Sequence, residues 1–320
     1  MKKKLVLPIL ITGASGFIGS NLLRRLIKNN ISCNIIIRKK SNLWRINDLL
    51  KSKYVKVHYG DLSNKKNTNK IIDKIKPKTV FHLATYGAYS FQSDEERAKK
   101  NILDNSINLF KACNKHNFKI FINTGTNSEY GFKSKKMSET DILEPNSFYA
   151  VFKSAVTQYL RYISLKNKLP IVTVRPFHVY GPYEESSRLI PTLILNLINM
   201  KMITLVSPKI SRDMLYIDDC VDLYIKIATN KNSYGAVYNM GSGKKITIKN
   251  IVEKAQKYTM TNKTLKPKFN TMNNKTWDQE IWLSDMSLVK KQLKWKHKIN
   301  LDSGIKKTYI WLKKNKNLYK

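Results

Sequence analysis

A tyrosine and a lysine four positions apart, Tyr149 and Lys153, are the residues of this chain best suited to moving a proton. On a helix, side chains at this spacing lie on one face. A lysine cation beside a phenol favours the phenolate and lowers the phenol pKa from ~10 toward neutrality. The pair therefore predicts Tyr149 as a general acid and base. The spacing is also typical of an ordinary surface pair, so the elements around it decide between the two interpretations.

A glycine-rich turn supplies a second kind of chemistry. Residues 12–19 read Thr-Gly-Ala-Ser-Gly-Phe-Ile-Gly, after an apolar run and before an amphipathic segment. The pattern predicts a strand, a turn and a helix. Gly13 allows the tight turn, Gly16 lets the backbone approach a pyrophosphate, and Gly19 lets the helix pack closely on the sheet. The helix N-terminus then offers N–H groups to the phosphates of a dinucleotide. A turn that binds nothing is the alternative.

The residues after the apolar segment at 33–37 indicate whether the dinucleotide is NAD or NADP. Sites that select NAD usually place an acidic residue about 20 residues beyond the glycines, where it binds the ribose 2′-hydroxyl. Arg38 occupies that place, 19 residues after Gly19, beside Lys39 and Lys40. An arginine binds a 2′-phosphate that a carboxylate would repel, so we expect NADP(H), with NAD as the alternative. Asp61, at the end of the following segment, is placed to accept a hydrogen bond from the adenine amino group.

Alternating short apolar and helical segments must position these residues. Segments that predict strands lie at residues 9–11, 33–37, 55–59, 79–83 and 118–123, and a long helical stretch ends near residue 115. Such alternation is typical of a parallel sheet covered on both faces. We expect a Rossmann-type, doubly wound α/β fold with ligands at the carboxyl ends of the strands. The first strand must begin at or after Pro8, because proline cannot donate to a central ladder.

The second half of the chain is less regular. The expected elements are a helix near residues 189–199, strands at 212–216 and 236–239, and helices near 247–259, 285–294 and 302–315. Neither a repeat nor a low-complexity linker divides the chain. We therefore expect residues 1–175 to form a dinucleotide-binding domain, with about 211–245 returning to it. Residues 176–320 are expected to form a smaller, intertwined C-terminal substrate domain.

The formal net charge of +37 raises the question of a nucleic-acid partner. Only nine of the 59 basic residues are arginines, and the lysines are scattered over the chain among many asparagines. No nucleic-acid-binding motif accompanies them. We therefore expect no nucleic-acid partner and a solvated, lysine-rich surface, which still favours the approach of an anionic substrate. A protein that binds other surfaces through a basic face is the alternative.

Cysteine usage and hydropathy bear on the compartment. Cys33, Cys113 and Cys220 are odd in number, far apart and in no Cys-x-x-Cys pair, which indicates a reducing cytoplasm and no metal site. The basic N-terminal residues are followed by too short an apolar run for a signal peptide. No stretch reaches the ~18 apolar residues of a membrane span. We expect a cytoplasmic protein without a membrane segment.

Taken together, these features give a chain that resembles the extended short-chain dehydrogenase/reductases. Among them it is similar to the NAD(P)-dependent epimerase/dehydratase family, which acts on nucleotide sugars. The resemblance covers nearly the whole chain and depends on the combination of motifs. The matching motifs are the glycine turn, Asp61-Leu62, His82-Leu83-Ala84, Thr126 four residues before Tyr130-Gly131, the Tyr149/Lys153 pair, Arg175-Pro176-Phe177-His178-Val179-Tyr180-Gly181-Pro182, Arg212-Asp213 with Tyr216-Ile217-Asp218-Asp219, Asn239-Met240-Gly241-Ser242-Gly243, and the C-terminal Asp285 and Leu293-Lys294-Trp295.

The resemblance implies a catalytic triad of Thr126, Tyr149 and Lys153. It implies that the two hydroxyl groups hold the sugar oxygen at C4 and that the tyrosine moves the proton while the nicotinamide exchanges hydride at C4. The lysine would also hold the nicotinamide ribose. The implied cofactor contacts are Gly13, Ser15, Gly16, Phe17, Ile18, Gly19, Arg38, Asp61, Leu62, Leu83, Ala84, Thr85, Tyr149, Lys153 and Pro176. The implied substrate contacts are Tyr86, Tyr89, Thr126, His178, Arg188 and Arg212, with Arg212 on the nucleotide diphosphate.

Departures from the family pattern narrow the reaction. The 4,6-dehydratases carry Asp-Glu directly after the catalytic threonine as acid and base for water elimination, whereas Asn127 and Ser128 stand here. Glu129 lies one place too late, which leaves its role open. Epimerase/reductases of the fucose-synthase type use a cysteine where Ser128 stands. His178 replaces the asparagine that many members place at the substrate phosphate, either as a phosphate contact or as a site acid.

Simple redox chemistry at sugar C4 remains. A 4-keto-reductase consumes NADPH once per turnover, whereas a 4-epimerase retains its cofactor, usually NAD, and rotates the keto sugar between two hydride transfers. Arg38 favours the reductase, and the segments around Tyr86, Thr126 and Tyr149 are similar to deoxysugar reductases that make abequose, paratose or fucose nucleotides for surface polysaccharides.

We therefore expect an NADPH-dependent 4-keto-6-deoxyhexose reductase whose partner is a nucleotide-diphosphate sugar. The alternatives are an NAD-dependent 4-epimerase, a 4,6-dehydratase and a catalytically silent NADP-binding regulator. The resemblance also implies a homodimer, formed through the helices at about residues 91–115 and 148–166.

Replacing Arg38 by aspartate is expected to move cofactor preference toward NAD, because a carboxylate binds the 2′-hydroxyl and repels a 2′-phosphate. Titrating the parent protein and Arg38→Asp with NADPH and with NADH measures the ratio of the two dissociation constants. An unchanged ratio would exclude Arg38 from the cofactor site.

Overall fold

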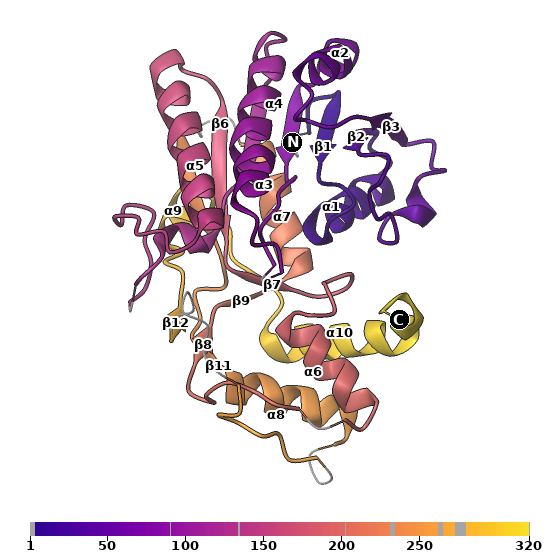
Figure 1. Ribbon diagram of the computed structural model, residues 1–320, viewed down its shortest axis with the longest axis vertical. Helices are drawn as coiled ribbons and strands as arrows, with labels where there is room; N and C mark the ends of the chain where they lie inside the picture. Colours follow the sequence, from indigo (N-terminus) through magenta and orange to yellow (C-terminus); the bar gives the residue numbers. More distant parts are fainter. Residues whose placement is uncertain are drawn as a thin grey trace. The chain divides into compact units, whose positions relative to one another are not determined.

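The computed structural model describes residues 4–89, 91–133, 135–201, 203–230, 234–261, 265–272 and 280–319. The chain divides into two compact units, whose elements are labelled in Figure 1. The first unit comprises residues 1–131, 142–176 and 221–238, and the second comprises 132–141, 177–220 and 239–320. The bounds differ in detail from those expected. The segment that returns to the first unit is 221–238 rather than about 211–245, and residues 132–141 group with the second unit.

A seven-stranded sheet forms the centre of the first unit. The strands are β1 (Ile9–Thr12), β2 (Cys33–Ile37), β3 (Val55–Tyr59), β4 (Thr79–His82), β5 (Ile120–Thr124), β6 (Ile171–Pro176) and β10 (Ala236–Met240). They lie in the order β10-β6-β5-β4-β1-β2-β3, and the pairs from β6 to β3 are all parallel. The order reverses between β1 and β4, where doubly wound folds bind their ligands. The predicted fold class is confirmed, and β1 begins directly after Pro8.

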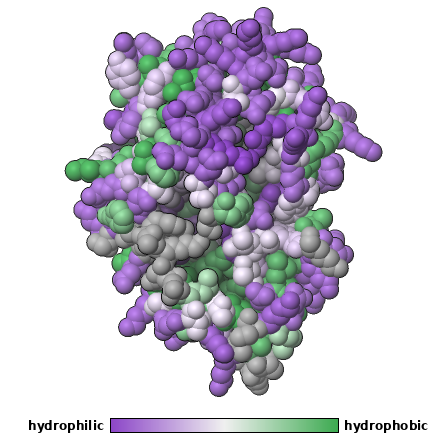
Figure 2. All heavy atoms as spheres, in the orientation of Figure 1, coloured by the Kyte–Doolittle hydropathy of each residue, from purple (hydrophilic) through white to green (hydrophobic). Residues whose placement is uncertain are grey.

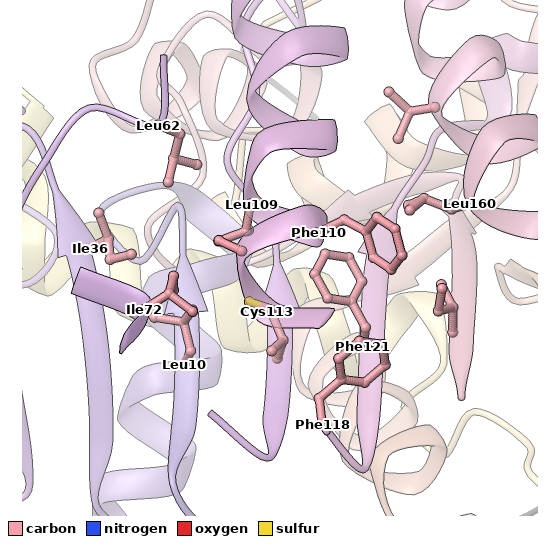
Figure 3. Packing of buried hydrophobic residues seen from close by; sticks show 14 of the residues in the cluster. Leu10, Ile36, Leu62, Ile72, Leu109, Phe110, Cys113, Phe118, Phe121 and Leu160 are labelled. Carbon is pink, nitrogen blue, oxygen red and sulfur yellow. The ribbon is translucent and has the colours of Figure 1, made fainter. Parts of the chain in front are cut away.

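Helices cover both faces of this sheet. One face carries α2 (Lys65–Ile75), α4 (Asn105–Asn114) and α5 (Phe148–Asn167), and the other carries α1 (Phe17–Lys28) and α7 (Ile217–Ala228). Figure 3 shows the first face, where Ile72, Phe110 and Leu160 of the helices pack on Leu10 and Phe121 of the sheet. On the opposite face, the rings of Phe81 and Tyr224 meet edge to face with centroids 6.3 Å apart. Burial on both faces is what the continuous apolar strands predicted.

The helical path into α4 changes pitch. α3 (Glu95–Lys99) continues through a π-helical segment, η2 (Lys100–Asp104), directly into α4. A π turn holds an extra residue and is frequent at functional sites. Just beyond it, the Ser106 hydroxyl donates to Ile102 O and lies 2.9 Å from His82 Nε2 of β4. The sequence predicted one helical stretch here and gave no sign of the change in pitch.

The second unit combines short strands with packed helices. β7 (His178–Tyr180) pairs in parallel with β9 (Met214–Tyr216), and β8 (Ser211–Arg212) lies between β11 (Ile246–Thr247) and β12 (Ile281–Trp282). The helices of this unit are α6 (Leu189–Ile198), α8 (Ile248–Thr259), α9 (Ser287–Leu293) and α10 (Leu301–Asn315), followed by the short η4 (Lys316–Tyr319). The four helices expected here are confirmed with small shifts at their ends. The strand expected at residues 212–216 is divided between β8 and β9. The other strands of this unit, two or three residues long, carry too little periodicity to be predicted.

The polarity of the surface and the burial of the cysteine thiols are those of an ordinary globular protein. Hydrophilic side chains cover most of the face of the first unit seen in Figure 2. Cys33, Cys113 and Cys220 are free and buried, and burial raises the pKa of each thiol. They therefore pack as small apolar groups. In the described part of the chain, no helix has the length and apolar character needed to cross a bilayer.

The predicted glycine turn is formed after β1, but the role of one of its glycines, Gly19, differs from the prediction. Gly13 has φ +72°, and a Cβ there would overlap the backbone of Leu83 and Ala84, so it supplies both the left-handed turn and the close approach of the end of β4. A Cβ on Gly19 would overlap the Gly13 carbonyl. Gly19 therefore lets α1 start against the turn itself, whereas the sequence analysis assigned it to packing on the sheet. A Cβ on Gly16 would lie 3.2 Å from Gly13 O, which is tight but tolerable.

Gly19→Ala is expected to lower the free energy of unfolding by about 1–3 kcal/mol, because the added methyl group must displace the backbone of the turn. The matched change Gly16→Ala should cost less than Gly19→Ala, since its methyl group meets a single carbonyl oxygen at 3.2 Å. Denaturant unfolding of both variants without cofactor measures the difference. A Gly19→Ala variant as stable as the parent would show that the turn tolerates a side chain at this position.

Candidate active site

Tyr149 and Lys153 lie on the first turns of α5, which Ser147 caps with its side chain. The Lys153 ammonium lies 5.9 Å from the centre of the Tyr149 ring and donates a hydrogen bond of 2.7 Å to Thr124 O at the end of β5. Burial lowers the Lys153 pKa to about 8, and the charge of Glu129 opposes this decrease. The structure thus brings the pair together and anchors its cation at the carboxyl edge of the sheet.

Thr126 follows β5 and caps the short helix η3 (Asn127–Tyr130). Its hydroxyl accepts the Ser128 N–H at 3.2 Å and donates to Ser128 Oγ at 3.3 Å. The residue is buried, with 7% of its surface exposed. The threonine hydroxyl is therefore held at the same strand end, that of β5, to which Lys153 is anchored.

Glu129 completes a capping box at this turn. Its Oε1 accepts the Thr126 N–H at 2.9 Å, and its Oε2 accepts from Arg175 Nε at 2.9 Å. Glu129 is 0% exposed and Arg175 is 3% exposed. The guanidinium also lies over the Tyr130 ring, 4.7 Å from its centre. Both carboxylate oxygens thus accept a hydrogen bond from the protein, which gives Glu129 a structural role at this turn.

The sequence analysis missed what Glu129 and Arg175 do. The spacing Thr-x-x-Glu is the signature of a capping box and was sufficient to predict the contact with Thr126. The partner of Arg175 lies 46 residues away in the sequence. That contact arises because β5 and β6 are neighbours in the sheet, and no local pattern indicates it.

The residues expected to bind a dinucleotide gather at the carboxyl ends of β1 to β4. Among the described residues, no side chain caps the N-terminus of α1, and its first turn holds no acidic residue. This end therefore fits a phosphate group. The other expected contacts in this unit are Ser15, Phe17 and Ile18 at the start of α1, Leu62 after β3, Leu83, Ala84 and Thr85 after β4, and Pro176 at the end of β6.

Arg38 and Asp61 follow β2 and β3, which are neighbouring strands. Arg38 is exposed. Burial raises the pKa of Asp61, but hydrogen bonds from Ser63 and the charges of Arg38 and Lys100 bring it below its usual value. The charge of Arg38 thus acts on Asp61. This is the proximity expected of two side chains that contact the adenosine part of the same dinucleotide. A cavity of about 580 Å³ borders this region, with Ser63 and Lys100 among its lining residues.

A buried polar chain ties the glycine turn to β4 and α4. Thr12 Oγ1 lies 2.7 Å from His82 Nδ1, and the Ala84 N–H donates to Thr12 Oγ1 at 3.4 Å. The other ring nitrogen of His82 contacts Ser106. Burial, and then the charge of Lys153, lowers the pKa of His82 to about 3, so the imidazole is neutral. The sequence analysis named His82 as part of a motif and gave it no structural role.

The loop after β4 borders Tyr149. A Cβ on Gly87 would lie 3.2 Å from Cδ2 of Tyr149, so the loop backbone contacts the tyrosine ring directly. The Arg97 guanidinium lies 4.8 Å from the centre of the neighbouring Tyr86 ring. This arrangement places Tyr86 beside the residue expected to move the proton. Tyr89, further along the loop, stacks on Phe91 with ring centroids 5.4 Å apart.

His178, Arg188 and Arg212 lie together in the second unit. Burial, followed by the charges of Arg212 and Arg188, lowers the pKa of His178 well below its usual value. Within the described residues, His178 Nδ1 is buried and has no hydrogen-bond partner. Two guanidinium groups beside an unpaired neutral imidazole fit a multiply charged anion such as a diphosphate.

The carboxyl group of Asp213 holds the segments around Arg212. It accepts the Ser242 N–H at 2.6 Å, the Gly243 N–H at 3.0 Å and the Ser284 N–H at 3.1 Å, as well as the hydroxyl groups of both serines. Asp213 is fully buried. The Arg-Asp motif was visible in the sequence, but the convergence of distant donors on the aspartate was not.

Comparison with known proteins is consistent with this geometry. A model described as the NAD dependent epimerase/dehydratase family matches residues 9–241. A dTDP-D-glucose 4,6-dehydratase of Dictyostelium discoideum is 28% identical over 361 residues, which cover 97% of this chain and 82% of that protein. A trifunctional UDP-glucose 4,6-dehydratase, 3,5-epimerase and reductase of Arabidopsis thaliana is 28% identical over 96% of this chain, which spans only 47% of that protein.

A solved structure agrees over the whole length. The UDP-glucuronic acid 4-epimerase from Bacillus cereus, in complex with UDP-glucuronic acid and NAD, is 27% identical. The superposition has a TM-score of 0.85 and covers 96% of this chain and 99% of that chain. The resemblance drawn from the sequence motifs is therefore confirmed, and the chain is an NAD(P)-dependent enzyme. It belongs to the NAD dependent epimerase/dehydratase family.

Proposed function

We propose that the protein is an NADPH-dependent reductase of the 4-keto group in a nucleotide-linked 6-deoxyhexose. One observation carries this proposal. The three expected catalytic residues, Thr126, Tyr149 and Lys153, are all present, whereas the nearby carboxylate of Glu129 is hydrogen-bonded to the protein. Elimination of water requires a free acid and base next to the sugar, and Asn127 and Ser128 supply neither. Hydride transfer at C4 requires only a proton donor and groups that hold the C4 oxygen.

The residues of the first unit divide this work. Bound NADPH supplies the hydride, and the hydroxyl groups of Thr126 and Tyr149 hold the C4 oxygen. Tyr149 gives its proton to that oxygen, and the Lys153 cation stabilises the phenolate that remains. Because the Lys153 pKa is about 8, the cation is present at neutral pH and is lost as the pH rises above that value. We therefore expect activity to fall on the alkaline side.

The choice of NADPH rests on Arg38. It is the first residue after β2, and its charge reaches Asp61 after β3. A guanidinium at this strand end suits a 2′-phosphate, and the absence of an acidic residue there removes the usual contact for the NAD ribose. We further propose that His178, Arg188 and Arg212 bind the diphosphate of the sugar nucleotide.

An NAD-dependent nucleotide-sugar 4-epimerase is the second candidate. Its support is the likeness to the Bacillus cereus UDP-glucuronic acid 4-epimerase, at 27% identity over nearly the full length. The same three catalytic residues serve both reactions, since epimerisation consists of an oxidation and a reduction at C4. The two candidates differ in whether the reduced cofactor is consumed or regenerated.

A homodimer is also proposed. Large apolar side chains are exposed along α5, where Phe148 is 52% and Tyr162 is 58% exposed. Val151 and Leu165 of the same helix are exposed as well. A second copy of this helix would cover them. Light scattering of the purified protein is expected to give about twice the chain mass of 37.2 kDa; a monomer mass at micromolar concentration would contradict the proposal.

The reaction is tested by adding CDP-, dTDP-, UDP- and GDP-linked 4-keto-6-deoxyhexoses to the protein with NADPH or NADH. Stoichiometric loss of reduced nicotinamide absorbance with one sugar nucleotide is expected, with NADPH preferred. If no reduced cofactor is lost, NAD remains tightly bound and a nucleotide hexose interconverts with its C4 epimer, the protein is an epimerase.

Tyr149→Phe is expected to lower turnover by roughly 10²–10⁴-fold, the usual contribution of a positioned acid or base. Cofactor affinity should be nearly unchanged, because the ring remains and only the hydroxyl is removed. Tyr234→Phe, an equivalent change at an exposed position outside α5, is the control. Full activity of Tyr149→Phe would exclude the proton-transfer role.

A further inference from the structure

We propose that Glu129, paired with Arg175, is a positioning residue that fixes Thr126 and keeps the positive charge on Lys153. One buried carboxylate would thereby organise both catalytic partners of Tyr149. The importance of Glu129 for catalysis rests on the proposed function, because that function requires Thr126 and a charged Lys153. The contacts of Glu129 within the protein do not depend on the identity of the substrate.

The geometry at Thr126 supplies the first part of the argument. Thr126 lies between β5 and η3, and its N–H donates to Glu129 Oε1 at 2.9 Å. A Cβ on the preceding Gly125 would overlap this same carboxylate oxygen. The backbone therefore wraps closely around the carboxylate, and the direction of the Thr126 side chain follows from that contact.

The surroundings of Lys153 supply the second part. In the described part of the chain, the Lys153 ammonium donates to the Thr124 carbonyl of β5 and lies near the Tyr149 ring of its own helix. It also interacts electrostatically with Glu129 of η3 and with His82 of β4. His82 is neutral, so it adds no negative charge. Burial favours the uncharged amine, and Glu129 is the carboxylate that opposes this effect.

Arg175 is the ion-pair partner of this fully buried carboxylate. Its Nε lies 2.9 Å from Glu129 Oε2, and both side chains are almost completely removed from water. Burying an ion is costly unless it is paired and hydrogen-bonded, and Glu129 meets both conditions. Arg175 thus stabilises the buried Glu129 by direct pairing. Glu129 in turn favours the charged form of Lys153.

The test measures the titration of Lys153 directly. In protein labelled with ¹³C at the lysine ε position, NMR is expected to show one resonance that titrates near pH 8, well below ordinary lysines, and Lys153→Met should remove it. Glu129→Gln keeps an oxygen for the Thr126 N–H but removes the charge. Its Lys153 midpoint is expected about one pH unit or more lower, as for the loss of a nearby opposite charge.

Two further variants protect this result against damage to the fold. Glu129→Gln/Arg175→Met leaves no unpaired buried charge and should show the same lowered midpoint. Glu253→Gln makes the same chemical change at an exposed position and should leave the titration unchanged. An unaltered Lys153 midpoint in the double variant would overturn the charge role.

The positioning of Thr126 is measured by hydrogen exchange of its amide. Glu129→Ala removes the acceptor, and protection is expected to fall roughly tenfold, as for the loss of one hydrogen bond. Glu129→Gln should restore most of this protection. Equal protection in the parent and Glu129→Ala would overturn the positioning role. Neither measurement uses substrate or cofactor, so both can fail while the proposed reaction stands, and both can succeed if the reaction proves to be another.

Discussion

The catalytic end of the first unit depends on a carboxylate that has been taken out of water. Removing an ion pair from water is costly, and the cost is recovered only where hydrogen bonds and geometry satisfy both partners. Glu129 meets this condition with the Thr126 N–H on one oxygen and Arg175 on the other. The pair joins the turn after β5 to the neighbouring strand β6.

The second unit uses the same device around Asp213. Donors from two separate stretches of chain converge on this aspartate, at Ser242-Gly243 and at Ser284. Its neighbour Arg212 is buried among these segments and lies with His178 and Arg188 in a cationic group. In both units, then, a residue expected to touch a ligand is held by a buried carboxyl group that touches the protein alone.

Most of the fold was predictable because the apolar strands and the glycine turn each carry a local signal. The strands β1 to β5 and the helix pattern of the second half follow from periodicity, and proline fixed where β1 starts. Tyr149 and Lys153 were predictable because both lie on one helix. The pairing of Glu129 with Arg175 and the contacts of His82 were not, since they join residues that only the sheet order brings together. The role of Gly19 was predicted incorrectly for a similar reason. Its nearest neighbour is the carbonyl of Gly13 and not the sheet, and this contact depends on how the turn folds back.

The π-helical segment between α3 and α4 has a consequence for how this protein can change over evolution. Each residue turns an α-helix by about 100°, so the helix before the segment and the helix after it have different angular phases. Loss of one residue within Lys100–Asp104 would restore a regular pitch. The buried face of α4, with Leu109 and Phe110, would keep its packing, while α3 would rotate and carry Arg97 away from Tyr86. A single-codon deletion at this point would therefore move the segment that contacts Tyr86 and also displace Ala98 of α3, which is buried in the core.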